Sequence, residues 1–122
     1  MTLDQLLAPM RVVESAGQPR AIGDHGHAYG LYQQHAEFRA TYSDPTCDAL
    51  DRESDERRIR NFTAAWLRDN PDGSIGQLLA AYNLGDEGAA EVDWSDPTYW
   101  QKYYAHGMTA ALLQTPARTL LV

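Results

Sequence analysis

The sequence predicts a mainly α-helical domain with a short β-hairpin or extended loop at about residues 16–30. Apolar residues recur at spacings of three and four over most of the chain, as they do along the buried face of a helix. Four of the nine glycines lie between residues 17 and 30, and glycine at that density interrupts helices. Because 122 residues is the size of one domain and is enough to bury a core, we expect residues 1–122 to form a single domain.

The first predicted helix covers residues 3–15. Thr2 or Asp4 can supply its N-cap. One apolar stripe runs along this helix: Leu3, Leu6, Leu7, Met10 and Val13. Pro9 lies within the stripe, where it either kinks the helix or begins a second helical segment. Glu14 falls in the last turn, one residue after a core position.

We expect any β-structure to be confined to residues 16–30. Ala21-Ile22 and Ala28-Tyr29 flank the turn Gly23-Asp24-His25-Gly26, which is typical of a short, irregular hairpin or an extended loop. Helical spacing then resumes from Leu31 to Tyr42.

Helices are predicted over three further segments, at residues 55–69, 74–83 and 97–113. The charged run from Asp48 to Glu56 is expected to be a solvated helix face or loop. A loop is expected over residues 83–93, where two further glycines occur, and a loose tail at residues 115–117.

The charge of the chain limits its partners. The formal net charge is −7 and the isoelectric point is about 4.8. Phosphate binding needs clustered Lys and Arg, so nucleic acid is not expected as a partner. The charge is uneven, because residues 1–42 carry a net −1 and residues 43–122 carry −6. No apolar run is long enough for membrane insertion, and the N-terminus lacks the pattern of a secretory signal peptide.

Cysteine and histidine do not predict a metal site. Cys47 is the only cysteine, so the chain can form neither an intrachain disulfide nor a cysteine-based zinc site. Burial as a small hydrophobe is favoured over a nucleophilic role for Cys47. His25 and His27 stand two apart on the predicted turn, but no further ligand has a convincing spacing, and zinc usually takes three or four. We expect no metal and no cofactor.

Glu14 has the setting of a catalytic acid. Cleavage of a glycosidic bond needs a proton for the leaving oxygen, and a carboxylic acid keeps one near neutral pH only if burial raises its pKa. Val12 and Val13 precede Glu14 and a glycine-rich segment follows it, so the side chain can project from a packed helix into a cleft. The amides of Gln33 and Asn83 suit hydrogen bonds to sugar hydroxyl and N-acetyl groups.

Three tyrosines have two interpretations. Tyr29, Tyr32 and Tyr82 can form walls against which sugar rings stack, and at these spacings they can equally be ordinary core residues.

Three short motifs occur in one order along the chain: Glu14-Ser15, Gly30-Leu31-Tyr32-Gln33 and Ala81-Tyr82-Asn83. Together with Tyr99-Trp100-Gln101-Lys102, they resemble the motifs of the soluble lytic transglycosylase and goose-type lysozyme group, in particular its small phage-type members. The resemblance spans about residues 3–104. Tyr32 departs from the pattern, since many members have methionine at that place.

The resemblance implies an α+β lysozyme-like fold with a cleft between two lobes. It implies cleavage of peptidoglycan glycan strands between N-acetylmuramic acid and N-acetylglucosamine, with Glu14 as the catalytic acid. Gln33, Tyr82 and Asn83 would bind substrate, and Ser15 would neighbour the acid.

Asp24 leaves the reaction outcome open. Some lysozymes place a second carboxylate in such a hairpin, where it holds the attacking water or stabilises positive charge on the sugar. Lytic transglycosylases lack this group and use a hydroxyl of the substrate itself. Asp24 can also simply form an Asx-type turn with Gly26.

The resemblance suits a phage-encoded protein made in the host cytoplasm and acting on the cell wall, either as a released endolysin or as part of the virion. The net charge of −7 favours an alternative, a catalytically inactive lysozyme-fold structural or wall-binding domain. A chitin-directed hydrolase would share the acid chemistry and differ in substrate.

Overall fold

The computed structural model describes residues 1–47 and 51–122, and its first helix, α1 (Leu3–Ser15), confirms the predicted bounds. Thr2 forms a capping box with Gln5, in which each side chain binds the backbone N–H of the other residue. Pro9 lies inside α1 and is buried. The helix ends at Ala16, whose φ of 52° places it in the left-handed region.

A three-stranded antiparallel sheet follows α1, with strand order β1-β2-β3. β1 (Ile22–Gly23) and β2 (Ala28–Tyr29) flank a short 3₁₀ turn, η1 (Asp24–Gly26), as the hairpin prediction required. β3 (Gln34–His35) lies beyond residue 30, so confining β-structure to residues 16–30 was wrong. A turn brings the chain back after β2, and Ala28 then pairs with His35.

The helix expected over Leu31 to Tyr42 is shorter than predicted, because β3 occupies part of that segment. α2 (Ala36–Tyr42) begins only after β3 and packs against α3 (Arg52–Asp69). The prediction that the charged run from Asp48 to Glu56 is solvated was also partly wrong, because Ser54 and Asp55 within α3 are buried. Asp55 forms a salt bridge of 2.7 Å with the buried Arg58, which offsets part of the cost of removing its charge from water. Asp48, where that run begins, lies outside the described residues.

The helices of the C-terminal half differ in length and number from those that the apolar spacing predicts. α4 (Ile75–Ala90) continues through most of the expected loop at residues 83–93, with a non-helical Gly85 (φ 71°, ψ 170°) inside it. The single helix predicted over residues 97–113 is instead two short ones, α5 (Gln101–Tyr104) and α6 (Ala110–Gln114). Gly107, at φ 91°, lies between them and interrupts the helix.

The tail predicted to be loose is packed. Residues Ala117–Leu121 form a second 3₁₀ helix, η2, which contacts α3. The Ala117 N–H donates to the Gly73 carbonyl at 2.8 Å, and Ala117 and Leu120 are buried in the core. Buried apolar contacts and a backbone bridge between Ser74 and Pro116 hold a segment that its sequence position alone suggested was free.

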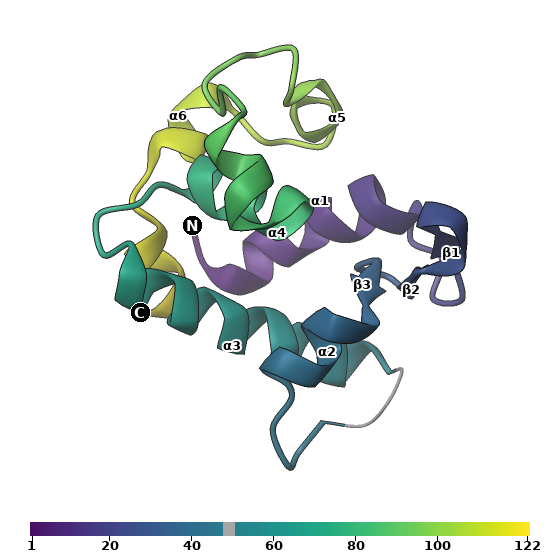
Figure 1. Cartoon of the computed structure of the whole chain (residues 1–122). Helices are drawn as coiled ribbons and strands as arrows, with labels where there is room; N and C mark the ends of the chain where they lie inside the picture. Colours follow the sequence, from purple (N-terminus) through teal and green to yellow (C-terminus); the bar gives the residue numbers. More distant parts are fainter. Residues whose placement is uncertain (48–50) are drawn as a thin grey trace.

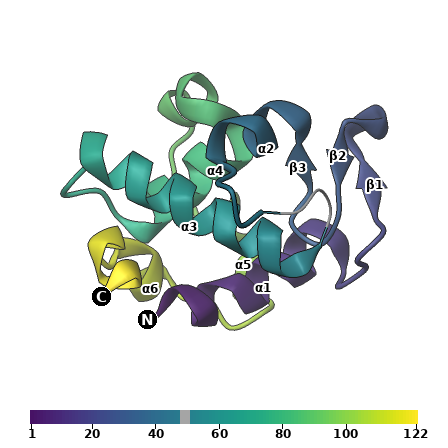
Figure 2. The ribbon, with the colours of Figure 1, turned by 90° about the horizontal axis from the view of Figure 1, so that it is seen from below.

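The elements are arranged around α1 (Figure 1). α3 and α4 lie on either side of it in this view, and the sheet stands beyond its C-terminal end, as the turned view also shows (Figure 2). One hydrophobic cluster joins the helices, and its most buried large side chains are Trp100 and Tyr32, both 0% exposed. Within the described part of the chain, no helix has the length and apolar character needed to cross a membrane.

Candidate functional site

Glu14 stands at the centre of a groove at the C-terminal end of α1. Burial raises the pKa of its carboxyl to about 7, and the nearby positive charge of Lys102 partly opposes that rise. A hollow of about 470 Å³ opens beside it, with side chains from α1, the sheet, α4 and α5 on its walls. The lining residues are Val13, Glu14, Asp24, Ala28, Gln33, His35, Tyr82, Asn83 and Lys102.

The groove continues on both sides of this hollow. A second hollow, of about 430 Å³, shares Val13, Glu14, Asn83 and Lys102 with the first and extends toward Tyr99. A third, of about 490 Å³, shares one residue, His35, with the first and extends along β2 to the start of α2. Glu14 therefore lies where the first two hollows meet; residues of the sheet line the first and third hollows, and residues of α4 and α5 line the first and second. A groove of this form suits a linear polymer that passes across Glu14.

Asp24 lines the central hollow together with Glu14 and contacts His35, which lines the same hollow. Its Oδ2 lies 3.2 Å from His35 Nε2, and both side chains are about half exposed. Asp24 and His25 have φ values of 48° and 54°, in the left-handed region that non-glycine residues rarely adopt. Strained backbone of this kind persists where surrounding structure enforces it and is often found at functional sites.

Gln33 lines the central hollow, but its amide is largely occupied within the protein. Its Nε2 donates to the carbonyls of Ala21 at 3.1 Å and Gly30 at 3.0 Å, so the side chain ties the turn after β2 to the segment before β1. A Cβ built on Gly23 would overlap Gln33 Oε1, which shows how closely the two pack. Gln33 therefore acts first as a brace for the hairpin that carries Asp24.

Tyr82 and Asn83 reach the groove from α4. The Tyr82 hydroxyl donates to the Tyr32 carbonyl at 2.7 Å, and its ring packs edge-on against Phe38. Burial, and after it the charge of Glu14, raises the pKa of Tyr82 well above its usual value. Asn83 is exposed and lines both hollows beside the acid, so its amide is accessible to a ligand.

Tyr29 lies along the outer arm of the groove rather than beside the acid. It lines the third hollow, and the Arg39 guanidinium stands 5.1 Å from the centre of its ring. A cation over a ring face attracts the ring's negative quadrupole, so this contact holds the tyrosine in place.

Tyr32 and Ser15 are not brought into the groove. Tyr32 is 0% exposed because its ring packs in the hydrophobic core instead of facing the groove. Its hydroxyl forms hydrogen bonds there with Arg11, at 2.9 Å, and with Glu56. The Ser15 hydroxyl donates to the Arg11 carbonyl at 2.9 Å, back along α1, and Ser15 lines none of the three hollows.

Lys102 and Tyr103, both on α5, are groove residues that the sequence did not single out as a site. Lys102 lines both hollows beside Glu14, and Tyr103 lines one of them. The Tyr103 hydroxyl is buried without a hydrogen-bond partner among the described residues, and burial followed by the charge of Glu14 raises its pKa. The only available signal was the Tyr-Trp-Gln-Lys pattern, which gives no indication that α5 packs against α1.

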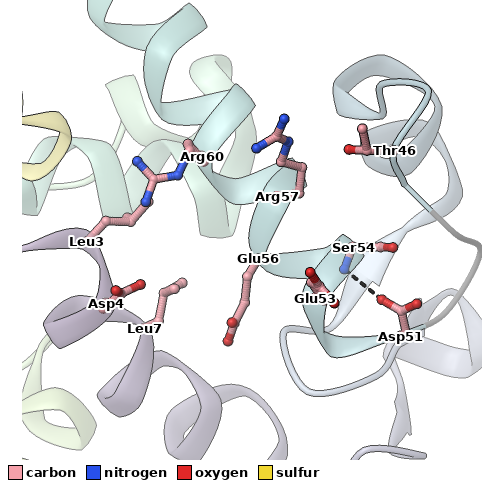
Figure 3. A pocket seen from close by; sticks show the side chains of 10 residues that line it. All are labelled: Leu3, Asp4, Leu7, Thr46, Asp51, Glu53, Ser54, Glu56, Arg57 and Arg60. Atoms are coloured by element: carbon pink, nitrogen blue, oxygen red, sulfur yellow. Dashed lines mark hydrogen bonds between the residues drawn. The ribbon is translucent and has the colours of Figure 1, made fainter.

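A separate hollow of about 580 Å³ lies between α1 and α3 (Figure 3). Acidic and basic side chains both line it: Asp4, Asp51, Glu53, Glu56, Arg57 and Arg60. Glu56 already pairs with Arg11 at 3.2 Å and Arg52 at 3.0 Å. Asp51 accepts a hydrogen bond of 2.7 Å from the Ser54 backbone as the N-cap of α3, the dashed line in Figure 3. Glu56 and Asp51 thus have partners within the fold, and none of the predicted site residues lines this hollow.

Within residues 1–47 and 51–122, no three His, Cys, Asp or Glu side chains come together as a metal site would require. No protein-family model, curated protein or solved structure matches this chain.

Proposed function

We propose that this chain cleaves the glycan strands of peptidoglycan between N-acetylmuramic acid and N-acetylglucosamine, with Glu14 as the general acid. The observation that carries the proposal is a partly buried carboxyl with a pKa of about 7 at the middle of a two-armed groove. Such an acid is still about half protonated at neutral pH, so it can give its proton to a leaving glycosidic oxygen.

The remaining groove residues fit a sugar ligand. Asn83 offers an amide on both sides of the acid, and Tyr29 and Tyr99 offer aromatic surface along the two arms. The groove extends to either side of Glu14, which suits cleavage within a chain. On these grounds, together with the motif order, we propose a lysozyme-like fold and kinship with the lytic transglycosylase and goose-type lysozyme group, in a phage-encoded protein.

Asp24 makes hydrolysis the favoured outcome. It lies in the same hollow as Glu14, so its carboxylate can hold a water or stabilise positive charge on the sugar ring. Asp24→Asn should then lower the rate by roughly 10²-fold or more. A loss of less than about threefold, with anhydro ends among the products, would instead assign the chain to transglycosylation by the substrate's own hydroxyl.

The decisive experiment is digestion of purified peptidoglycan, with mass spectrometry of the products. Wild-type protein should release muropeptides, and Glu14→Gln should lower the rate by at least roughly 10²-fold, because an amide cannot supply the proton. Glu91→Gln is the matched control, since Glu91 is exposed and lines none of the three groove hollows. Full activity in Glu14→Gln would overturn the proposal. Wild-type protein that binds walls without cleaving them would establish the inactive binding domain.

A further inference from the structure

Lys102 occupies an unusual place in this chain. It is the only lysine among the 122 residues. It lies on α5, is exposed, and lines both hollows that meet at Glu14. Its charge reaches the acid, since it opposes the rise in the pKa of Glu14 that burial causes.

The charges around Lys102 distinguish it further. The acidic residues lining the three hollows are Glu14, Asp24 and Glu37, and the only other basic residues there, in the described part of the chain, are His27 and His35. Lys102 is therefore the one permanent cation on the described walls of the groove, in a protein of net charge −7. No described residue forms a salt bridge with its ammonium, which remains accessible to an anion in the groove.

We propose that Lys102 determines substrate specificity, its ammonium binding a carboxylate carried on the lactyl substituent of a sugar seated beside Glu14. This inference rests on the proposed function and adds that the groove selects an acidic amino-sugar polymer over a neutral one such as chitin. The carboxylate can be the free lactyl group of a strand without peptides or a carboxylate of the attached stem peptide, and both offer the same charge to the ammonium.

The test compares three preparations of one glycan. The first has free lactyl carboxylates, the second has them converted to neutral amides, and the third retains its stem peptides. Assays at pH 5.5 keep Glu14 protonated in every variant, because that pH lies well below its pKa of about 7. Wild-type KM should be roughly three- to tenfold lower for the free carboxylate than for the amide, the range expected of a partly exposed ion pair. If the strands with peptides behave like the first preparation, the peptide supplies the carboxylate; if they behave like the second, the lactyl group does.

Lys102→Met should abolish this preference with little effect on kcat, and Lys102→Arg should restore most of it. Arg68→Met is the charge-matched control, since it removes one exposed cation that lines none of the groove hollows, and it should keep the preference. Equal KM values of the wild-type protein for the first two preparations would overturn the proposal. So would a Lys102→Met variant that slows all three substrates alike, because Lys102 would then act only through Glu14.

A binding measurement keeps this inference separate from catalysis. Reductive methylation with ¹³C-formaldehyde labels one side chain, Lys102, besides the terminal amine. In Glu14→Gln, the dimethyl-lysine resonance should shift on addition of the free-carboxylate glycan and not of its amide. If the resonance shifts in this way but the wild-type protein cleaves no glycan, the proposed function is wrong while carboxylate binding by Lys102 still holds. An unmoved resonance would overturn the role of Lys102 even in an active enzyme.

Discussion

The protonation of Glu14 is set by two opposing effects, burial and the charge of Lys102. Removal of its carboxyl from water raises its pKa, and the Lys102 ammonium lowers it, with the net result of about 7 against a usual 4.5. Desolvation is the larger effect, so the carboxyl of Glu14 keeps its proton at pH values below about 7.

Activity should therefore have an alkaline limit set by Glu14. Under the proposed function the protonated form is the active one, so kcat/KM should fall by half near pH 7 and about tenfold for each further pH unit. In Lys102→Met the limit should move to higher pH, because the charge that lowers the pKa of Glu14 is gone. A pH–rate profile on a neutral amide-converted glycan checks this without interference from substrate charge. A limit that stays fixed in the variant would contradict the coupling of Lys102 to Glu14.

The free energy of unfolding should also depend on pH through Glu14. A raised folded-state pKa means that ionising Glu14 costs free energy in the folded protein. This cost is absent below about pH 4.5 and complete above about pH 7. Glu14→Gln cannot ionise, so its advantage in unfolding free energy over wild type should grow from near zero at pH 4 to about 3 kcal/mol at pH 8. Urea denaturation at both pH values measures it. A pH-independent difference would mean that Glu14 is not desolvated.

At the scale of elements, local patterns were predictable and pairings between distant segments were not. The stripe along residues 3–15 and its cap specified α1 with its bounds, and the turn around Asp24 specified the β1–β2 hairpin. β3 was missed because Gln34-His35 has no strand pattern in its sequence. It becomes a strand only because the chain folds back and pairs with β2. Likewise, the sequence placed Glu14 near the hairpin but not near Lys102, which lies 88 positions further on.

The turn that returns the chain to β3 depends on Gly30. Its φ of 82° is costly for any other residue, and a Cβ there would lie 3.1 Å from the buried Asp55 Oδ2. Gly30→Ala should thus destabilise the fold by about 2 kcal/mol or more. Gly17→Ala is the matched control, since Gly17 has φ 76° and open space around it, and its cost should be only about 1 kcal/mol. Equal losses in thermal denaturation would mean that the close approach to Asp55 has no effect.

At the scale of the whole molecule, the net charge of −7 opposes approach to an anionic wall. Added salt up to about 0.1 M shortens the screening length to about 10 Å, so it should weaken this long-range repulsion while affecting the short Lys102 contact less. Cleavage of whole walls should then accelerate over that range, and cleavage of a neutral soluble glycan should not respond. A steady fall in wall cleavage from the lowest salt concentration upward would contradict the expectation that long-range repulsion is the effect that salt weakens most.

The packing of η2 has a consequence for how the domain is made. Leu120 fills the same core as Leu3, and Ala117 is bonded to Gly73, so the interior is not closed until residues near 120 are available. Glu14 and Asp24 are synthesised long before η2, the segment that completes this core. A fragment that stops before Ala117 should therefore lack the packed interior that holds the elements around Glu14 and Asp24 in place.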